Sequence, residues 1–181
     1  MLLRELVELR DVHLALVGEG ELRERLETEA KSLHIVERVH FLGEISVEAA
    51  YEVIGAADVF LFPSKYEAMP IALLEAMCLG VPIVASNIPA NREVLLNAGI
   101  LIAAGNPTEY ARAIQGILDN PALAARLISL ARSRSSQFQL DTMVSGYEQL
   151  FAKSWDLANS DASGGPIGRS SVEISHPIHT P

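Results

Sequence analysis

The sequence predicts an α/β fold, a doubly wound parallel sheet followed by C-terminal helices. Short apolar runs alternate with longer helical stretches between residues 2 and 102. Each run is apolar at consecutive positions rather than at every second one, as in residues 59–62, and glycines such as Gly18 and Gly43 close the runs. Strands of a parallel sheet show this pattern because helices cover both of its faces.

The predicted strands and helices follow one another in regular order. We expect strands at residues 12–17, 39–42, 59–62, 81–85 and 99–102. A first helix ends near residue 9, and the next three are expected at residues 21–33, from about 46, and at 70–79. Ser46 is a typical N-cap, with Glu48 close behind it. From residue 107 the pattern predicts helices alone, at residues 109–118, 122–132 and 141–153, which we expect to pack against the sheet.

Composition indicates one folded domain, residues 1–155, and a disordered tail, residues 156–181. The chain has 181 residues, of which 49% are hydrophobic, so it can bury a core. The tail is rich in Ser, Gly and Pro and has few large apolar side chains to offset the entropy of ordering. A net charge of -9 with scattered Lys and Arg argues against nucleic acid or an anionic membrane as the partner.

The N-terminus and the cysteine content favour a cytoplasmic protein. Arg4 and Glu5 interrupt the stretch in which a signal peptide needs an apolar core, and no apolar stretch reaches the ~20 residues of a transmembrane helix. Cys78 is the single cysteine and lies in an apolar run, so we expect it to be buried and reduced.

Residues 62–80 are the segment in which we expect the chemistry. A strand runs into a short loop that contains Glu67, and Pro70 then opens a helix at a position where its missing N–H costs nothing. Ligands of such sheets bind beyond the carboxyl ends of the strands. The loops to consider therefore follow Val17, Leu42, Phe62 and Ala85.

Glu75 is the single charge on a helix, residues 70–79, that is otherwise apolar all round, so we expect this helix to be buried on both broad faces and the Glu75 carboxylate to need a partner. An unpaired buried carboxylate costs several kcal/mol, whereas a helix dipole returns only about 0.3 to 1 kcal/mol. The vicinal hydroxyls of a ribose would bind both carboxylate oxygens, as acidic residues do in other nucleotide-binding folds. The alternative is that Glu75 lies in water at the edge of the sheet.

Glu67 and Glu75, with seven residues between them, lie in a segment that closely resembles the E-x7-E motif of glycosyltransferase family 4. Four further landmarks are similar to the C-terminal domain of that family and come in the same order, at residues 16–22, 39–43, 80–85 and 89–93. The resemblance covers about residues 2–151. It implies the donor-binding half of a retaining glycosyltransferase of the GT-B fold.

The resemblance also implies which residues bind a nucleotide sugar. Glu67 would reach hydroxyls of the donor sugar at the catalytic centre, positioning it rather than acting as an established nucleophile, and Glu75 would hold the ribose. The loop between them would offer backbone N–H groups to sugar and phosphate, which fits the anion affinity of a helix N-terminus. The candidate binding residues are therefore Glu67, Ala68, Met69, Pro70, Ile71 and Glu75, with Leu42 and Gly43 facing the base through their main chain and Gly18 in the adjacent loop.

The implied reaction transfers a hexosyl group from a UDP- or GDP-sugar to an acceptor hydroxyl with retention, and it needs no cofactor besides this donor. Two departures from the family pattern bear on it. Ala68 stands where members commonly have Gly, which would cost roughly 1 kcal/mol if the backbone were left-handed there. The chain also starts downstream of the family's strand bearing an Arg and a Lys that neutralise the diphosphate, and of the acceptor-binding domain. We therefore expect an incomplete enzyme and, as a partner, a separate N-terminal GT-B half.

Two other functions stay open, a non-catalytic nucleotide-binding or interaction fragment and a GT-B epimerase that acts on a nucleotide sugar. A metal enzyme is not favoured, since the five histidines show no ligand spacing with carboxylates or cysteine. Residues 18–20, Gly-Glu-Gly, lack the third glycine of a dinucleotide-binding fingerprint, so a turn that ends the strand is the simpler interpretation.

Overall fold

The computed structural model describes residues 2–9, 11–103 and 105–160 of the 181-residue chain. These residues divide into two compact units at the boundary between Gln139 and Leu140, and each unit is described by itself. The first unit holds the described strands and the candidate site. The second is a helix, α8 (Leu140–Ser160), so the domain boundary predicted at residue 155 falls inside a helix. Residues 161–181 of the predicted tail lie outside the described part of the chain.

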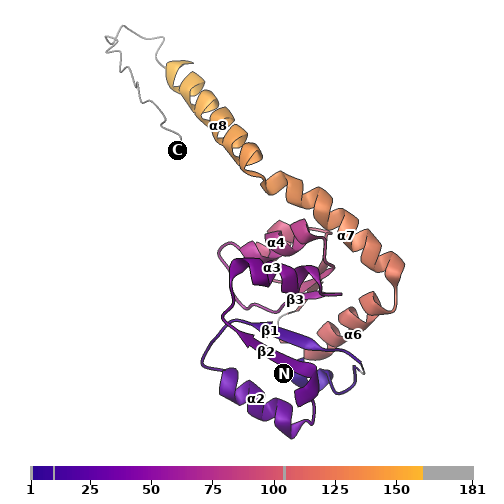
Figure 1. The fold of residues 1–181 in the computed structure, drawn as a ribbon. Coiled ribbons are helices and arrows are strands. Elements are labelled where there is room, and N and C mark those ends of the chain that lie inside the picture. Colours follow the sequence, from indigo (N-terminus) through magenta and orange to yellow (C-terminus); the bar gives the residue numbers. More distant parts are fainter. Residues whose placement is uncertain (1, 10, 104, 161–181) are drawn as a thin grey trace. The chain divides into compact units, whose positions relative to one another are not determined.

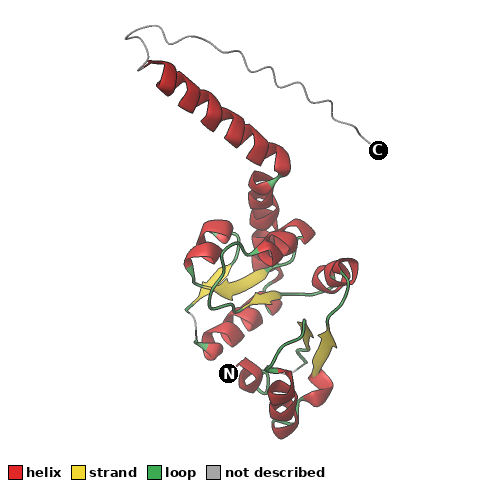
Figure 2. Cartoon of the chain, turned by 90° about the vertical axis from the view of Figure 1, so that its left-hand side faces the viewer, coloured by secondary structure: helices red, strands yellow, loops and turns green. Residues whose placement is uncertain are grey.

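The strands of the first unit are parallel, as predicted, and form two sheets. β1 (Leu14–Val17) pairs with β2 (Val39–Gly43), and Leu14 lies opposite Val39. β3 (Phe60–Phe62), β4 (Ile83–Ser86) and β5 (Ile100–Ile102) form the second sheet in the order β3-β4-β5. Figure 2 shows the strands in these two groups. The sequence predicted the pairing direction but not the division into two sheets.

Helices connect consecutive strands, which is the connection that parallel pairing requires. The helices of the first unit, with two short 3-10 helices, are α1 (Leu2–Glu5), α2 (Arg23–Ser32), η1 (Val36–Arg38), α3 (Val47–Gly55), α4 (Ile71–Leu79), α5 (Pro89–Leu95), α6 (Pro107–Leu118), α7 (Pro121–Ser135) and η2 (Ser136–Phe138). Figure 1 shows α3 next to α4, and α2 on the side of β1 and β2. Among the described α-helices, the seven-residue α5 is the one that the sequence did not predict, and the two 3-10 helices were not predicted either.

Side-chain caps explain where several helices begin. The Ser46 hydroxyl accepts a hydrogen bond from the Ala49 N–H at 3.2 Å, which confirms the predicted N-cap of α3. Asn106 and Asn120 cap α6 and α7 in the same way, and proline follows each of them at the first helical position. The cap satisfies a backbone donor that the helix itself leaves open.

Two apolar cores lie on opposite faces of β4, which is buried along its whole length. Val84 belongs to one core, shared with α1, α6 and the β1–β2 sheet. Ile83 and Ala85 belong to the other, shared with α4 and α5. Successive side chains of a strand point to opposite faces, so β4 is covered on both sides, as the run of consecutive apolar residues predicted.

The prediction that α4 is buried all round is wrong. Leu73, Ala76 and Met77 are buried, but Ile71 is 61% exposed and Cys78 is also exposed. The elements that pack on α4, namely α3, α5, α7 and β4, leave the side of the helix that carries Ile71 and Cys78 in water. The prediction of a buried Cys78 therefore fails too. None of the described helices is both long and apolar enough to cross a membrane.

Candidate nucleotide-sugar site

The loop between β3 and α4 places Glu67 beyond the carboxyl end of a strand, as predicted. Its carboxylate is half-buried and accepts a hydrogen bond from the Ser64 hydroxyl, with 2.6 Å between Ser64 Oγ and Glu67 Oε1. Glu67 Oε2 makes no hydrogen bond within the described residues. One carboxylate oxygen is thus fixed by the protein and the other remains for a ligand.

Glu75 lies on α4, where its carboxylate is half-buried and held by a tyrosine. The Tyr51 hydroxyl, on the neighbouring helix α3, donates a hydrogen bond to Glu75 Oε1 at 3.1 Å. This hydrogen bond, with the negative charge of Glu75, raises the pKa of the Tyr51 phenol. The sequence predicted that the Glu75 carboxylate needs a partner, and in this structure that partner is the Tyr51 phenol. As at Glu67, only one of the two carboxylate oxygens is bound by the protein.

The residues between the two glutamates provide fewer free amides than expected. Pro70 is the N-cap of α4 and has no N–H, and the Ile71 N–H donates to the Met69 carbonyl at 3.0 Å. The amides of Ala68 and Met69 make no hydrogen bond within the described residues, so these two are the ones left for an anion. Ala68 does not adopt a positive φ, so alanine brings no left-handed strain to this loop.

The loops after β1 and β2 lie together. The Gly18 N–H donates to the Gly43 carbonyl at 2.7 Å, which joins two of the predicted residues. Gly43 has φ +71°, a backbone conformation that favours glycine. Leu42 is 39% exposed at the end of the same strand. No hydrogen bond joins these loops to Glu67 or Glu75 within the described residues.

Arg23 is the basic side chain beside these loops, and acidic groups already pair with it. It forms ion pairs with Glu19 and, at 2.9 Å, with Glu27. The hydrogen bond to Glu27 is the main reason why the pKa of Arg23 is raised. Arg4 pairs with Glu29 at 3.5 Å. Neither arginine therefore replaces the basic diphosphate ligands that the family resemblance implies.

Two buried polar residues near the loop escaped the sequence analysis. Ser86 ends β4 and Asn91 lies in α5, and both are fully buried. The sequence could have identified them. Ser86 follows four apolar residues of a predicted strand, and Asn91 lies within one of the segments that resemble the family. Their hydrogen bonds lead back to the loop of Glu67, as described below.

The structure also brings two histidines together. His13 Nδ1 and His40 Nε2 are 2.9 Å apart, and the rings stack with 5.2 Å between their centroids. Both side chains are exposed, His40 on β2 and His13 directly before β1. The described residues contain no group of three or more His, Cys, Asp or Glu that could hold a metal ion.

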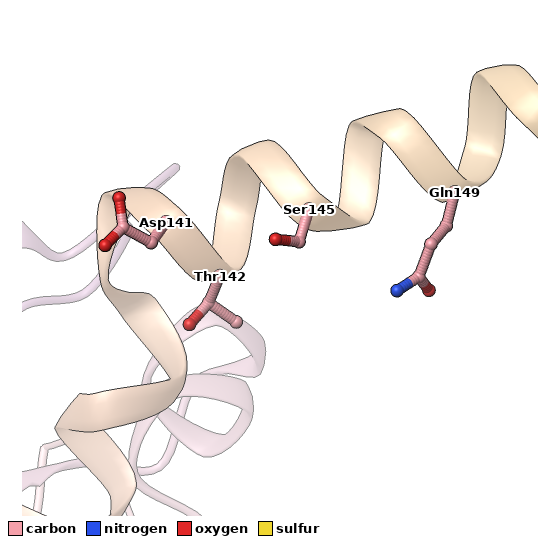
Figure 3. A pocket seen from close by; sticks show the side chains of 4 residues that line it. All are labelled: Asp141, Thr142, Ser145 and Gln149. Atoms are coloured by element: carbon pink, nitrogen blue, oxygen red, sulfur yellow. The ribbon is translucent and has the colours of Figure 1, made fainter.

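Each unit has a hollow in its surface. A pocket of about 190 Å³ is lined by three predicted residues, Ala68, Met69 and Pro70, together with Ala90, Glu93, Val94 and Phe138. In the second unit a wide, open depression of about 530 Å³ runs along one side of α8. Figure 3 shows that its lining side chains all come from this helix, namely Asp141, Thr142, Ser145 and Gln149. A single helix surface does not enclose a ligand, so the first pocket is the relevant one.

Parallel strands joined by helices form an α/β domain, and solved glycosyltransferases of the GT-B fold are similar to it in structure. The family model of glycosyl transferases group 1 matches residues 2–134. The chain belongs to this family.

Relatives and solved structures agree with this assignment. The chain is 30% identical to glycogen synthase of Mycobacterium tuberculosis over 153 residues, 81% of this chain and 37% of that protein. It is 32% identical to N-acetyl-alpha-D-glucosaminyl L-malate synthase of Bacillus anthracis, over 85% of this chain and 40% of that protein. Sucrose-phosphate synthase of Thermosynechococcus elongatus is similar in structure, with a TM-score of 0.72 and 30% identity, over 84% of this chain and 42% of that one.

HepE of Anabaena, solved in complex with UDP, has a TM-score of 0.75 and 23% identity, over 84% of this chain and 44% of that one, and supports the fold. The chain spans less than half the length of each of these proteins.

Proposed function

We propose that this chain is the donor-binding part of a retaining family 4 hexosyltransferase and that it binds a UDP- or GDP-sugar at the loop between β3 and α4. The observation that carries the proposal is the pair of half-buried carboxylates, Glu67 and Glu75, each held at one oxygen by a protein hydroxyl. A carboxylate fixed in this way is oriented before the ligand arrives, which lowers the entropic cost of binding.

Each part of the loop has its own role in the proposed complex. Glu67 accepts hydrogen bonds from hydroxyls of the donor sugar, and Glu75 accepts them from the ribose. The free amides of Ala68 and Met69, at the positive end of α4, face the diphosphate. Leu42 and Gly43 meet the base through their main chain, in the loop that Gly18 stabilises. The reaction then depends mainly on electrostatic stabilisation of the departing diphosphate.

The ribose assignment is tested by comparing UDP and GDP with their 2′-deoxy forms in calorimetry. Glu75→Ala is expected to weaken binding of the ribonucleotide by roughly 1 to 3 kcal/mol, because two hydroxyls lose their acceptor. The same variant is expected to remove most of the preference for the ribonucleotide over the deoxynucleotide. Glu52→Ala, a change at an exposed carboxylate of α3, is the matched control and should leave both affinities unaltered.

Equal affinity of the wild-type chain and Glu75→Ala for the ribonucleotide would exclude the ribose role. A preference for the ribonucleotide that survives in Glu75→Ala would exclude it as well, because another group would then read the hydroxyl.

A second candidate is a non-catalytic nucleotide-binding or interaction fragment, which the pairing of Arg4 and Arg23 with glutamates favours, because neither arginine is free to bind a diphosphate. The two candidate functions differ in whether the chain can take part in sugar transfer. We expect the donor-binding part to transfer sugar to an acceptor when a homologous N-terminal GT-B half is added. A non-catalytic fragment binds the nucleotide and does not transfer under any such condition.

A further inference from the structure

A buried chain of hydrogen bonds connects α5 to the candidate loop through the end of β4. The Asn91 amide Nδ2 donates to the Ser86 carbonyl at 2.9 Å and lies 3.1 Å from the Ser86 hydroxyl. The Ser86 hydroxyl in turn donates to the Ser64 carbonyl. Both Ser86 and Asn91 are 0% exposed, so water does not compete for these bonds.

The chain continues from Ser64 to the carboxylate of Glu67. The Ser64 carbonyl is held by Ser86, and the hydroxyl of the same residue donates to Glu67 Oε1 at 2.6 Å. Hydrogen bonds to a charged acceptor are shorter and stronger than those between neutral groups. The position of Glu67 is therefore coupled, through one residue, to a serine at the end of a buried strand.

Packing alone does not account for these polar residues. Ser86 follows Ile83, Val84 and Ala85, which are all 0% exposed, and an apolar residue at its position would continue the same core. Within the described residues, Asn91 Oδ1 and the hydroxyl of Tyr110 are buried and make no hydrogen bond. A polar network that is only partly satisfied costs stability, so it is expected where a side chain must be oriented.

We propose that Ser86 and Asn91 are positioning residues that hold Glu67, through Ser64, in the orientation that recognises the donor sugar. The inference rests on the proposed function, because it assigns Glu67 to the sugar. Ser86 and Asn91 are therefore expected to affect how tightly the sugar part of the donor binds, and not the nucleotide part. Within the described residues they make no hydrogen bond to Glu75 or to the amides of Ala68 and Met69, so we expect the nucleotide part of the donor to bind independently of them.

The test measures two affinities for the full 181-residue chain, that for the nucleoside diphosphate and that for the corresponding nucleotide sugar. The donor is first chosen by titrating UDP-glucose, UDP-N-acetylglucosamine and GDP-mannose and taking the tightest. Ser86→Ala is expected to weaken nucleotide-sugar binding roughly tenfold and to leave nucleoside diphosphate binding unaltered. Ser86→Thr keeps the hydroxyl and should restore most of the affinity for the nucleotide sugar. Ser32→Ala, which removes an exposed hydroxyl on α2, is the control and should change neither affinity.

A double-mutant cycle separates positioning from general destabilisation. If Ser86 acts through Glu67, Ser86→Ala adds no further loss to Glu67→Gln, because the group that it orients is already altered. Should Ser86→Ala not fold, Ser64→Ala replaces it in the cycle, since Ser64 is only half-buried and contacts Glu67 directly.

The outcomes separate the two proposals. A wild-type chain that binds no nucleoside diphosphate and none of the donors overturns the proposed function and this inference with it. Donor binding by the wild type, together with unaltered sugar preference in Ser86→Ala, overturns this inference alone. Losses from Ser86→Ala and Glu67→Gln that simply add also overturn it, because the two residues then act independently.

Discussion

Leu73→Ala measures how far the donor loop depends on the core beneath it. Leu73 lies in the first turn of α4, is 0% exposed, and packs with Ala76, Met77, Ile83 and Ala85. Removing three carbons at about 0.8 kcal/mol each costs about 2.4 kcal/mol of transfer free energy. The alanines among these neighbours cannot extend into the space, and only Met77 is flexible enough to fill part of it.

The cavity adds to this cost. If roughly 40 to 80 Å³ stays empty, the cavity costs about 1 to 2 kcal/mol more, at ~24 cal/mol per Å³. We therefore expect the free energy of unfolding of Leu73→Ala to fall by about 3.4 to 4.4 kcal/mol. Ile71→Ala, two positions earlier and 61% exposed in the wild type, is the control and should change it by less than about 0.5 kcal/mol.

Urea unfolding followed by far-UV circular dichroism gives the free energy of unfolding of both variants. We expect the slope of this free energy against urea concentration to stay the same. Tryptophan fluorescence is unsuitable, because the single tryptophan, Trp155, lies in α8 and so in the other unit. Amide exchange in β4 reports directly on the first unit. A loss below about 1.5 kcal/mol for Leu73→Ala would refute the packing argument, as would an equal loss for Ile71→Ala.

Three further predictions concern other contacts. Arg134→Ala removes hydrogen bonds to the carbonyls of Glu93 (2.8 Å) and Val94 (3.1 Å) near the end of α5, so we expect about 1 to 2 kcal/mol of destabilisation in thermal unfolding, and an unchanged melting temperature would contradict it. Glu75 raises the pKa of Tyr51 above its usual value near 10.0, so the stability that this bond provides is present below pH 10 and is lost as the pH rises through the raised pKa. In Tyr51→Phe this part of the alkaline loss is expected to disappear from unfolding curves measured between pH 8 and 11, and an unchanged pH profile would count against the bond. In a transfer assay, residues 1–181 alone are expected to give no product, because Arg4 and Arg23 are paired with glutamates and neither is free to stabilise the departing diphosphate, a loss of about 3 kcal/mol, and turnover by the unassisted chain would reverse this expectation.

The strands and most helices were predictable because their signals are local. Consecutive apolar residues identified β4, and the Ser46 cap marked the start of α3 within one residue. The helix α5 was missed because its seven residues are too few to show a helical period, and Pro89 at its start is equally typical of a loop. The division into two sheets depends on which strands meet, a property that no local pattern encodes.

The site was predictable in its residues and less so in its contacts. The spacing of Glu67 and Glu75 identified the loop, but their partners, Ser64 and Tyr51, were not predicted. Tyr51 precedes Glu75 by 24 positions, on another helix, so only the packing of α3 on α4 brings the two together. Cys78 was misjudged for a related reason, because an apolar sequence does not reveal which face of a helix has a covering layer.

The exposure of Cys78 has a practical consequence. It is the single cysteine of the chain and lies three residues after Glu75, so the two side chains share one side of α4. A thiol-reactive fluorophore would therefore attach at one position, close to the carboxylate assigned to the ribose, without any engineered residue. Nucleotide arrival could then be followed as a change in emission, which gives association and dissociation rates in addition to affinities.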